Sequence, residues 1–182
     1  MPRWSPSRLF PAVAVTAGVG VFAAAPALAG VDRISSQGTL VGYASAVPED
    51  AAARVEAVYD TAGDSTITLE VTGLKPRTEY GAHAHAYPCG ERPRDAGPDY
   101  QQVPNPDPER PRDWTYENAG NEIWLDFTTD ESGDATAETT VNWQFSPGRR
   151  AGSVIIHAEH TTLGPRDAGV AGARLACLSV GF

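Results

Sequence analysis

Two histidines stand two residues apart in the stretch GAHAHAYPCG, residues 81–90, which also holds one of the two cysteines of the chain. In a β-strand alternate side chains point to the same face, so His83 and His85 share one face and the alanines around them share the other. The face of small apolar residues suits a packed interior. The imidazole face therefore suits a site that lies outside that interior, beneath a loop.

A third histidine, His157, lies in the apolar stretch SVIIHAEH. If this stretch is one continuous strand, His157 and His160 point to opposite faces. His83, His85 and His157 could then converge as three imidazole ligands, a set that suits copper or zinc. On spacing alone the alternative stays open that each is a packed or hydrogen-bonded core residue.

The elements that must position these histidines are strands. Short alternating or β-branched runs recur with turn-forming residues between them, and no helical period is sustained, so the sequence predicts an all-β fold. We expect strands at 37–46, 54–60, 65–73, 79–87, 122–130, 135–145, 152–160 and 173–182. Residues 88–112 hold seven prolines and no alternation, which predicts a long loop directly after the His-x-His strand.

The beginning of the chain has the pattern of an export signal. Arg3 and Arg8 precede an apolar stretch that ends in APALA, an A-x-A pattern typical of signal cleavage. We interpret residues 1–29 as a secretory signal peptide cut after Ala29 and residues 30–182 as one domain; an uncleaved membrane anchor is the alternative. Cleavage removes two arginines and no acidic residue, so the formal charge changes from -9 to -11. Such an acidic, exported domain is a poor partner for nucleic acid and for anionic membranes, and we expect no stable membrane partner after cleavage.

The two cysteines, Cys89 and Cys177, are expected to pair, because exported proteins meet an oxidising environment. The enclosed loop spans 88 residues, and the chain-entropy treatment assigns such a cross-link about 4 to 5 kcal/mol.

The order of several segments is similar to that in the copper/zinc superoxide dismutase family. The segments are GLKPRTEYGAHAHAYPCG, AGPDY, TTDESGDATAE, SVIIHAEHTTLG and AGARLACLSVGF. The chain resembles the secreted bacterial type over essentially the whole of residues 30–182. The resemblance implies an eight-stranded Greek-key β-barrel or flattened sandwich with a copper site on its outer face. It also implies dismutation of superoxide to oxygen and hydrogen peroxide.

The resemblance implies roles for single residues. His83, His85 and His157 resemble three copper ligands of the family. Arg174, in RLAC, resembles the arginine that stands over the copper and attracts the superoxide anion. A fixed guanidinium has a clear physical purpose in an acidic protein, because it reverses the local potential for an anionic substrate. The two cysteines resemble the intrasubunit disulfide that anchors the loop.

The chain departs from the family at the zinc site. Asp99 stands in AGPD, where the family carries in AGPH the histidine that bridges copper and zinc. No histidine lies between Tyr100 and Gln144, and the zinc aspartate has no clear match, so we expect copper and no zinc. The family's other bridging carboxylate has only Thr161 and Thr162 to match it.

Three interpretations of Asp99 stay open: a fourth ligand, an acceptor for a copper-bound water, or a loop residue of no catalytic consequence. His160 has no matching family ligand and could be a partner of His157 outside the ligand set if the strand ends early. We expect a secreted copper-dependent superoxide dismutase with Arg174 and Asp99 at its reacting centre. The alternatives are an extracellular copper-binding protein with weak or no dismutase activity, and a structural domain that has lost the metal.

Overall fold

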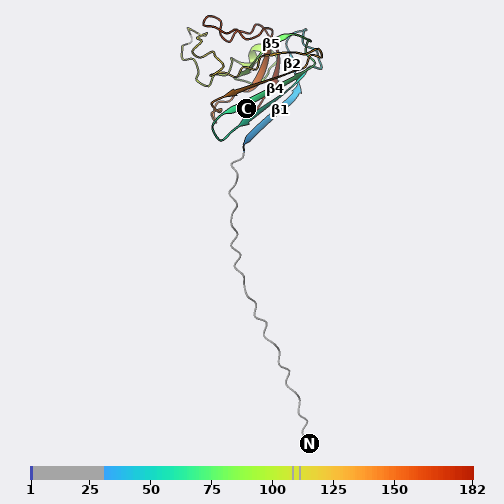
Figure 1. Ribbon diagram of the computed structural model, residues 1–182, viewed down its shortest axis with the longest axis vertical. Helices are drawn as coiled ribbons and strands as arrows, with labels where there is room; N and C mark the ends of the chain where they lie inside the picture. Colours follow the sequence, from blue (N-terminus) through green and yellow to red (C-terminus); the bar gives the residue numbers. More distant parts are fainter. Residues whose placement is uncertain (2–30, 108, 111) are drawn as a thin grey trace.

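In the computed structural model the described residues are Met1, 31–107, 109–110 and 112–182, so the expected signal peptide and its cleavage site lie outside them apart from Met1. The described residues form nine strands and one short 3-10 helix (Figure 1). These are β1 (Asp32–Thr39), β2 (Val41–Gly42), β3 (Ala52–Tyr59), β4 (Ser65–Thr72), β5 (Glu79–His85), η1 (Pro93–Ala96), β6 (Phe127–Thr128), β7 (Ala135–Val141), β8 (Ser153–His157) and β9 (Arg174–Ser179). Within the same residues, no helix is long and apolar enough to cross a membrane.

The strands form two antiparallel sheets that face each other. One has the order β1-β3-β4-β7 and the other the order β2-β9-β8-β5-β6. The sheets do not close into a barrel, so the structure is the flattened sandwich among the two forms that we expected. The all-β prediction is confirmed, and the main core lies between the two sheets.

The two sheets bury their strands in different ways. In β4 the buried side chains alternate with less buried ones, so Ile67 and Leu69 face the core while their neighbours face solvent. In β5 all residues after Glu79 are buried, and β8 is buried throughout. Since one face of β5 and β8 packs on the core, the other face must lie beneath the loops.

The alternation predicted for the His-x-His strand is confirmed. Ala82 and Ala84 belong to the main core, whereas His83 and His85 are fully buried on the opposite face. On that outer face a small apolar cluster contains Ala96 of η1, so the loop after β5 packs back onto the sheet.

Three strand predictions need correction. The stretch predicted at 37–46 divides between the sheets: residues up to Thr39 pair with β3, and Val41–Gly42 pair with β9. The stretch 122–130 begins in a turn, where the backbone N–H of Glu122 bonds to the carbonyl of Asn118, and it forms a regular strand only at Phe127–Thr128. The stretch 152–160 ends as a strand at His157, although Ala158 and Glu159 still bond to the backbone just before β9.

Candidate metal centre

Four side chains meet on the outer face of the five-stranded sheet. His83 and His85 come from β5, His157 comes from the neighbouring strand β8, and Asp99 comes from the loop after η1. Each offers one ligand atom, and these atoms all lie within 4.8 Å of one another. Three imidazoles and a carboxylate form a donor set that suits copper or zinc.

The backbone places Asp99 beside the histidines. Residues 96–100 run along the end of β5, where Ala86 N–H bonds to Pro98 at 2.9 Å and Tyr100 N–H bonds to Ala84 at 2.8 Å. Asp99 itself forms an isolated bridge with His85. Main-chain hydrogen bonds therefore fix the backbone of Asp99 beside β5, and this places its carboxylate next to the histidines.

Backbone carbonyls orient two of the imidazoles. The Nδ1 atom of His85 lies 3.1 Å from the carbonyl oxygen of Gly97, and Nδ1 of His157 lies 3.4 Å from that of Gly172. A carbonyl only accepts, so each Nδ1 carries the proton and each Nε2 presents a lone pair. Both glycines have positive φ, 74° and 75°, a conformation that other residues adopt only with strain.

The lone pairs of His85 and His157 face each other and the carboxylate. The two Nε2 atoms are 3.4 Å apart, and His85 Nε2 is 2.9 Å from Asp99 Oδ1. Atoms that all accept hydrogen bonds repel one another at such distances unless a proton or a cation lies between them. The arrangement is therefore one that a metal ion would stabilise.

His83 contributes an atom with no partner. Its Nδ1 is buried and has no hydrogen bond among the described residues, although Asp99 Oδ2 lies 3.5 Å away. A buried polar atom without a partner costs free energy. A metal ion bound to Nδ1 would remove that cost, so the residues present fit a metal.

The charges in the site act on one another. Burial opposes ionisation of Asp99, but contacts with His83 and His85 hold its pKa well below the usual range. Burial lowers the pKa of His83, and the interaction with Asp99 more than reverses this, so that the pKa is raised. Burial, followed by the charge of His83, lowers the pKa of His157 to about 4. The site thus holds the anionic carboxylate of Asp99 and the imidazole of His157, which is neutral near pH 7.

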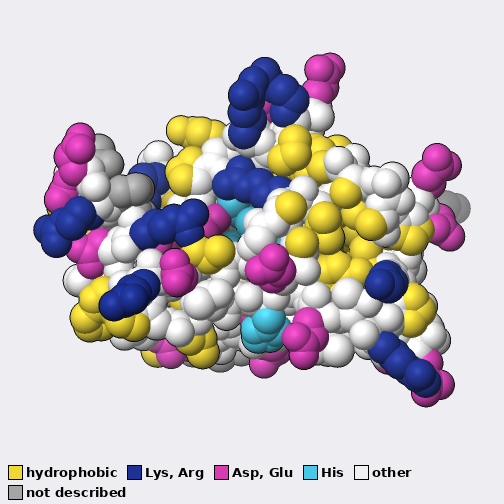
Figure 2. All heavy atoms as spheres, turned by 90° about the horizontal axis from the view of Figure 1, so that it is seen from above, with side chains coloured by type: hydrophobic (Ala, Val, Ile, Leu, Met, Phe, Trp, Pro, Cys, Tyr) yellow, Lys and Arg dark blue, Asp and Glu magenta, His cyan; other side chains and the backbone are white. Residues whose placement is uncertain are grey.

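An open cavity of about 910 Å³ leads to this site. Asp99 and Arg174 both line it, together with Arg149 and Arg150 from the loop between β7 and β8. Figure 2 shows histidine side chains at the floor of a hollow, with Lys or Arg side chains on its rim.

Arg174 is held close to the histidine cluster by the sheet. It pairs with His157 across the β8–β9 ladder at an irregularity in the register. Its Nη1 donates to the carbonyl oxygen of Pro93 at 3.0 Å, which connects it to the loop that carries Asp99. The structure thus brings Arg174 to the same cavity as Asp99.

Two further carboxyl groups line this cavity. Glu122 is 1% exposed, and its oxygens accept from Gln101 Nε2 at 2.9 Å and from Trp124 Nε1 at 2.7 Å. Burial and the charge of Asp99 raise the pKa of Glu122 to about 7. Burial also raises the pKa of Glu117 to about 7.

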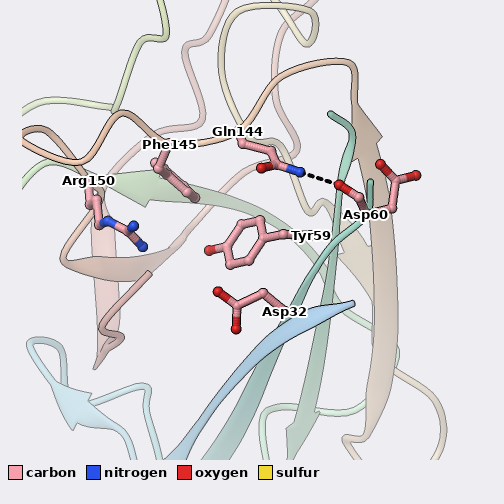
Figure 3. A pocket seen from close by; sticks show the side chains of 6 residues that line it. All are labelled: Asp32, Tyr59, Asp60, Gln144, Phe145 and Arg150. Atoms are coloured by element: carbon pink, nitrogen blue, oxygen red, sulfur yellow. Dashed lines mark hydrogen bonds between the residues drawn. The ribbon is translucent and has the colours of Figure 1, made fainter. Parts of the chain in front are cut away.

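A second, smaller cavity shares Arg150 with the first (Figure 3). It measures about 220 Å³ and is lined by Asp32, Tyr59, Asp60, Gln144, Phe145 and Arg150. The clustered histidines are not among these residues, and we assign this cavity no role.

The disulfide prediction is confirmed: Cys89 and Cys177 are joined, with Cα atoms 5.8 Å apart. Because Cys177 lies in β9 and Cys89 begins the loop after β5, the bond fastens that loop to the sheet. A disulfide is typical of proteins in oxidising compartments.

His160, which the sequence offered as a possible partner of His157, has Asp126 as its partner. Its Nδ1 lies 3.0 Å from Oδ2 of Asp126. Sequence reasoning did not single out Asp126 or Glu122. The signal available in the sequence was the apolar run EIWLDF, residues 122–127, which has an acidic residue near each end. An acidic residue among buried apolar neighbours indicates a buried carboxylate.

Comparisons with known proteins agree with this geometry. Residues 51–180 match the family described as copper/zinc superoxide dismutase (SODC). Among curated protein sequences, none matches this chain. The crystal structure of the clock protein EA4 is similar in fold, with a TM-score of 0.53 and 18% identity over 82% of this chain and 92% of that chain. The family match covers well over half of the sequence, and the chain belongs to the copper/zinc superoxide dismutase family.

Proposed function

We propose that this protein is a secreted superoxide dismutase that uses a single copper ion without zinc. His83, His85 and His157 hold the ion, and Asp99 is the fourth ligand. The observation that carries the proposal is the convergence of one ligand atom from each of three imidazoles and one carboxylate, all within 4.8 Å of one another, beside an open cavity. Among the described residues, it is the one group of three or more His, Cys, Asp or Glu side chains whose ligand atoms lie close enough together to hold a metal ion.

Bound copper supplies the one-electron steps by which one superoxide is oxidised to oxygen and a second is reduced to hydrogen peroxide. Arg174 attracts the anion into the cavity, because the guanidinium is always charged and is held in place by the carbonyl of Pro93. Asp99 keeps its negative charge, since contacts with His83 and His85 hold its pKa low. The two protons of the product come from the solvent in the open cavity.

The proposal includes no separate zinc site because the histidines that would build one are missing: the sequence has no histidine between Tyr100 and Gln144. Asp99 stands at the position of the family's bridging histidine, and the structure directs its two oxygens toward His85 and His83. The disulfide and the family membership support an extracytoplasmic location, with superoxide as the substrate.

The test is elemental analysis of the oxidised protein after equilibration with equal copper and zinc, followed by a measurement of superoxide decay. We expect about one copper per chain, no stoichiometric zinc, and copper-dependent dismutation. His157→Ala should lose both copper and activity. Stoichiometric zinc bound beside copper would refute the copper-only site, and one bound copper without dismutation would support a copper-binding protein.

A further inference from the structure

A single carboxylate connects three segments behind the histidine cluster. Asp126 lies between two buried residues just before β6, and its side chain is 14% exposed. Oδ1 accepts from the backbone N–H of Ala82 at 3.2 Å, and Oδ2 accepts from that of Thr161 at 2.8 Å. Oδ2 also lies 3.0 Å from Nδ1 of His160. The carboxylate thus ties β5 and the loop after β8 to its own segment.

The hydroxyl of Thr161 stands between this carboxylate and His83. Thr161 Oγ1 is 2.6 Å from Asp126 Oδ1 and 2.7 Å from His83 Nε2. The direct distance from Asp126 Oδ1 to His83 Nε2 is 4.0 Å, too long for a hydrogen bond. The carboxylate therefore reaches the imidazole only through the hydroxyl.

The direction of both hydrogen bonds follows from the number of protons. An ionised carboxylate only accepts, so the single hydroxyl proton of Thr161 must be donated to Asp126. The hydroxyl oxygen can then only accept from the imidazole, and His83 Nε2 must carry a proton. In the neutral imidazole this leaves Nδ1 as a lone pair, and Nδ1 is the buried atom without a hydrogen-bond partner.

We propose that Asp126, acting through Thr161, is the positioning carboxylate of His83. It fixes the tautomer in which Nδ1 is free, and it turns that atom toward the proposed metal. The inference rests on the copper site proposed above. The sequence comparison sought a supporting carboxylate at Thr161 and Thr162. The inference assigns that role to Asp126, which lies in a different segment.

The main test is Thr161→Val, which removes the hydroxyl and keeps the branched shape. Asp126 then keeps its bonds to the backbone N–H groups of Ala82 and Thr161, so the fold should survive. His83 Nε2–H loses its acceptor, and the proton can move to Nδ1, where Asp99 accepts it and where it competes with the metal. Loss of such supporting contacts costs 10- to 100-fold in metal affinity in other sites.

Copper affinity is measured by competition with a chelator, and the Cu(II) paramagnetic resonance spectrum reports the ligand field. We expect Thr161→Val to lower the affinity about 10- to 100-fold and to change the spectrum. Thr161→Ser restores the hydroxyl and should return both to near the parent values. Thr162→Val is the matched control, because Thr162 is exposed and its hydrogen bonds among the described residues, to Val170 and from Gly169, are made by its backbone.

The inference is overturned if Thr161→Val binds copper with the parent affinity and spectrum, or if Thr161→Ser is as weak as Thr161→Val. Failure of the parent protein to bind copper would instead refute the proposed function. Far-ultraviolet circular dichroism of the metal-free variants checks that the fold is intact. If Thr161→Val does not fold, the Cu(II) spectra of Thr161→Ser and Asp126→Asn are compared instead. A spectrum of Asp126→Asn that is like that of the parent also overturns the inference.

Discussion

Glu122 offers a quantitative test of the electrostatics around the site. Its pKa is raised from 4.5 to about 7 by burial and by the charge of Asp99. The folded protein therefore holds the proton more tightly than the unfolded chain does. The stabilisation of the folded state by protonated Glu122 is fully present below pH 4.5 and is lost as the pH rises to about 7. At 1.36 kcal/mol per pH unit, a rise of this size corresponds to about 3 kcal/mol.

Glu122→Gln removes this dependence. The amide can still accept from Trp124, but its NH2 group faces the NH2 group of Gln101, so one hydrogen bond worth about 1 kcal/mol is lost. We expect the variant to be less stable than the parent by about 1 kcal/mol at pH 4.5. At pH 9 the avoided cost of the buried charge exceeds that loss, and the variant should be more stable by about 2 kcal/mol.

The measurement is urea unfolding of the metal-free, disulfide-bonded protein at several pH values. The parent profile also contains His157, whose lowered pKa of about 4 makes stability rise with pH up to about 6.5. Subtracting the parent profile from that of the variant removes this contribution. Glu79→Gln removes one charge at an exposed site and is the control for net charge. A difference between Glu122→Gln and the parent that is the same at pH 4.5 and pH 9 would refute the reasoning.

Three further predictions concern the site and its loop. Asp99→Ala should lower copper affinity tenfold or more if the carboxylate is a ligand, whereas Asp99→His should tighten Cu(II) binding without stoichiometric zinc; parent affinity in both variants would contradict this. Arg174→Glu should lower the rate constant for superoxide about tenfold or more and reverse its salt dependence, with Arg166→Glu as an exposed control and an unchanged rate as the contrary result. Replacing Cys89 and Cys177 by serine should cost about 4 to 5 kcal/mol of stability and speed hydrogen exchange in residues 88–112, and full loop protection would show that the bond is not needed there.

The histidine face could be predicted from the sequence because it depends on local geometry. Alternation in a strand has a period of two, so the alanines of GAHAHA necessarily point away from the histidines. The core contains Ala82 and Ala84, and the cluster contains His83 and His85, as the alternation requires. The disulfide could be predicted because two cysteines allow only one intramolecular pair, and the chain was expected to be exported.

The stretch 122–130 was predicted as one continuous strand, but it pairs with β5 only in separate pieces, an isolated bridge at Trp124 and the two residues of β6. Trp124 forms only an isolated bridge to His83, and Leu125 donates to the carbonyl of Ala82. The segment is buried along an irregular path, which gives it the same apolar pattern as a strand. Periodicity alone does not separate these two cases.

The role of Asp126 could not be predicted from its neighbours in the chain. The carboxylate contacts Thr161, 35 residues away, and the backbone of Ala82, 44 residues away. Those contacts depend on how the loop after β8 crosses the end of β5. That crossing is close: a Cβ on Gly81 would stand 2.6 Å from the carbonyl oxygen of Glu159. The sequence contains the required residues, but only the folded chain brings them together.

The proposed copper-only site differs from a four-imidazole site mainly in its charge. Three neutral imidazoles add no charge to the ion, whereas a carboxylate ligand such as Asp99 adds one negative charge. The set then carries a charge of about +1 with Cu(II) and about zero with Cu(I), one less in each state than with a neutral fourth ligand. A carboxylate ligand therefore favours the oxidised ion and weakens the attraction for superoxide in both states.

Arg174 opposes this effect from the wall of the same cavity. At roughly 5 Å and an effective dielectric constant of about 20, one unit charge changes the energy of an anion by about 3 kcal/mol, so each residue can outweigh the distant charges of an acidic surface. In the proposed dismutase, access of superoxide depends on the balance between the charge of Asp99 and those of Arg174, Arg149 and Arg150 in the same cavity, and not on the number of copper ligands alone. A dismutase and a copper-binding protein built on this site can hold the same metal with the same ligands. They differ in whether these arginines overcome the charge of Asp99, so the salt dependence of superoxide decay separates them where copper content does not.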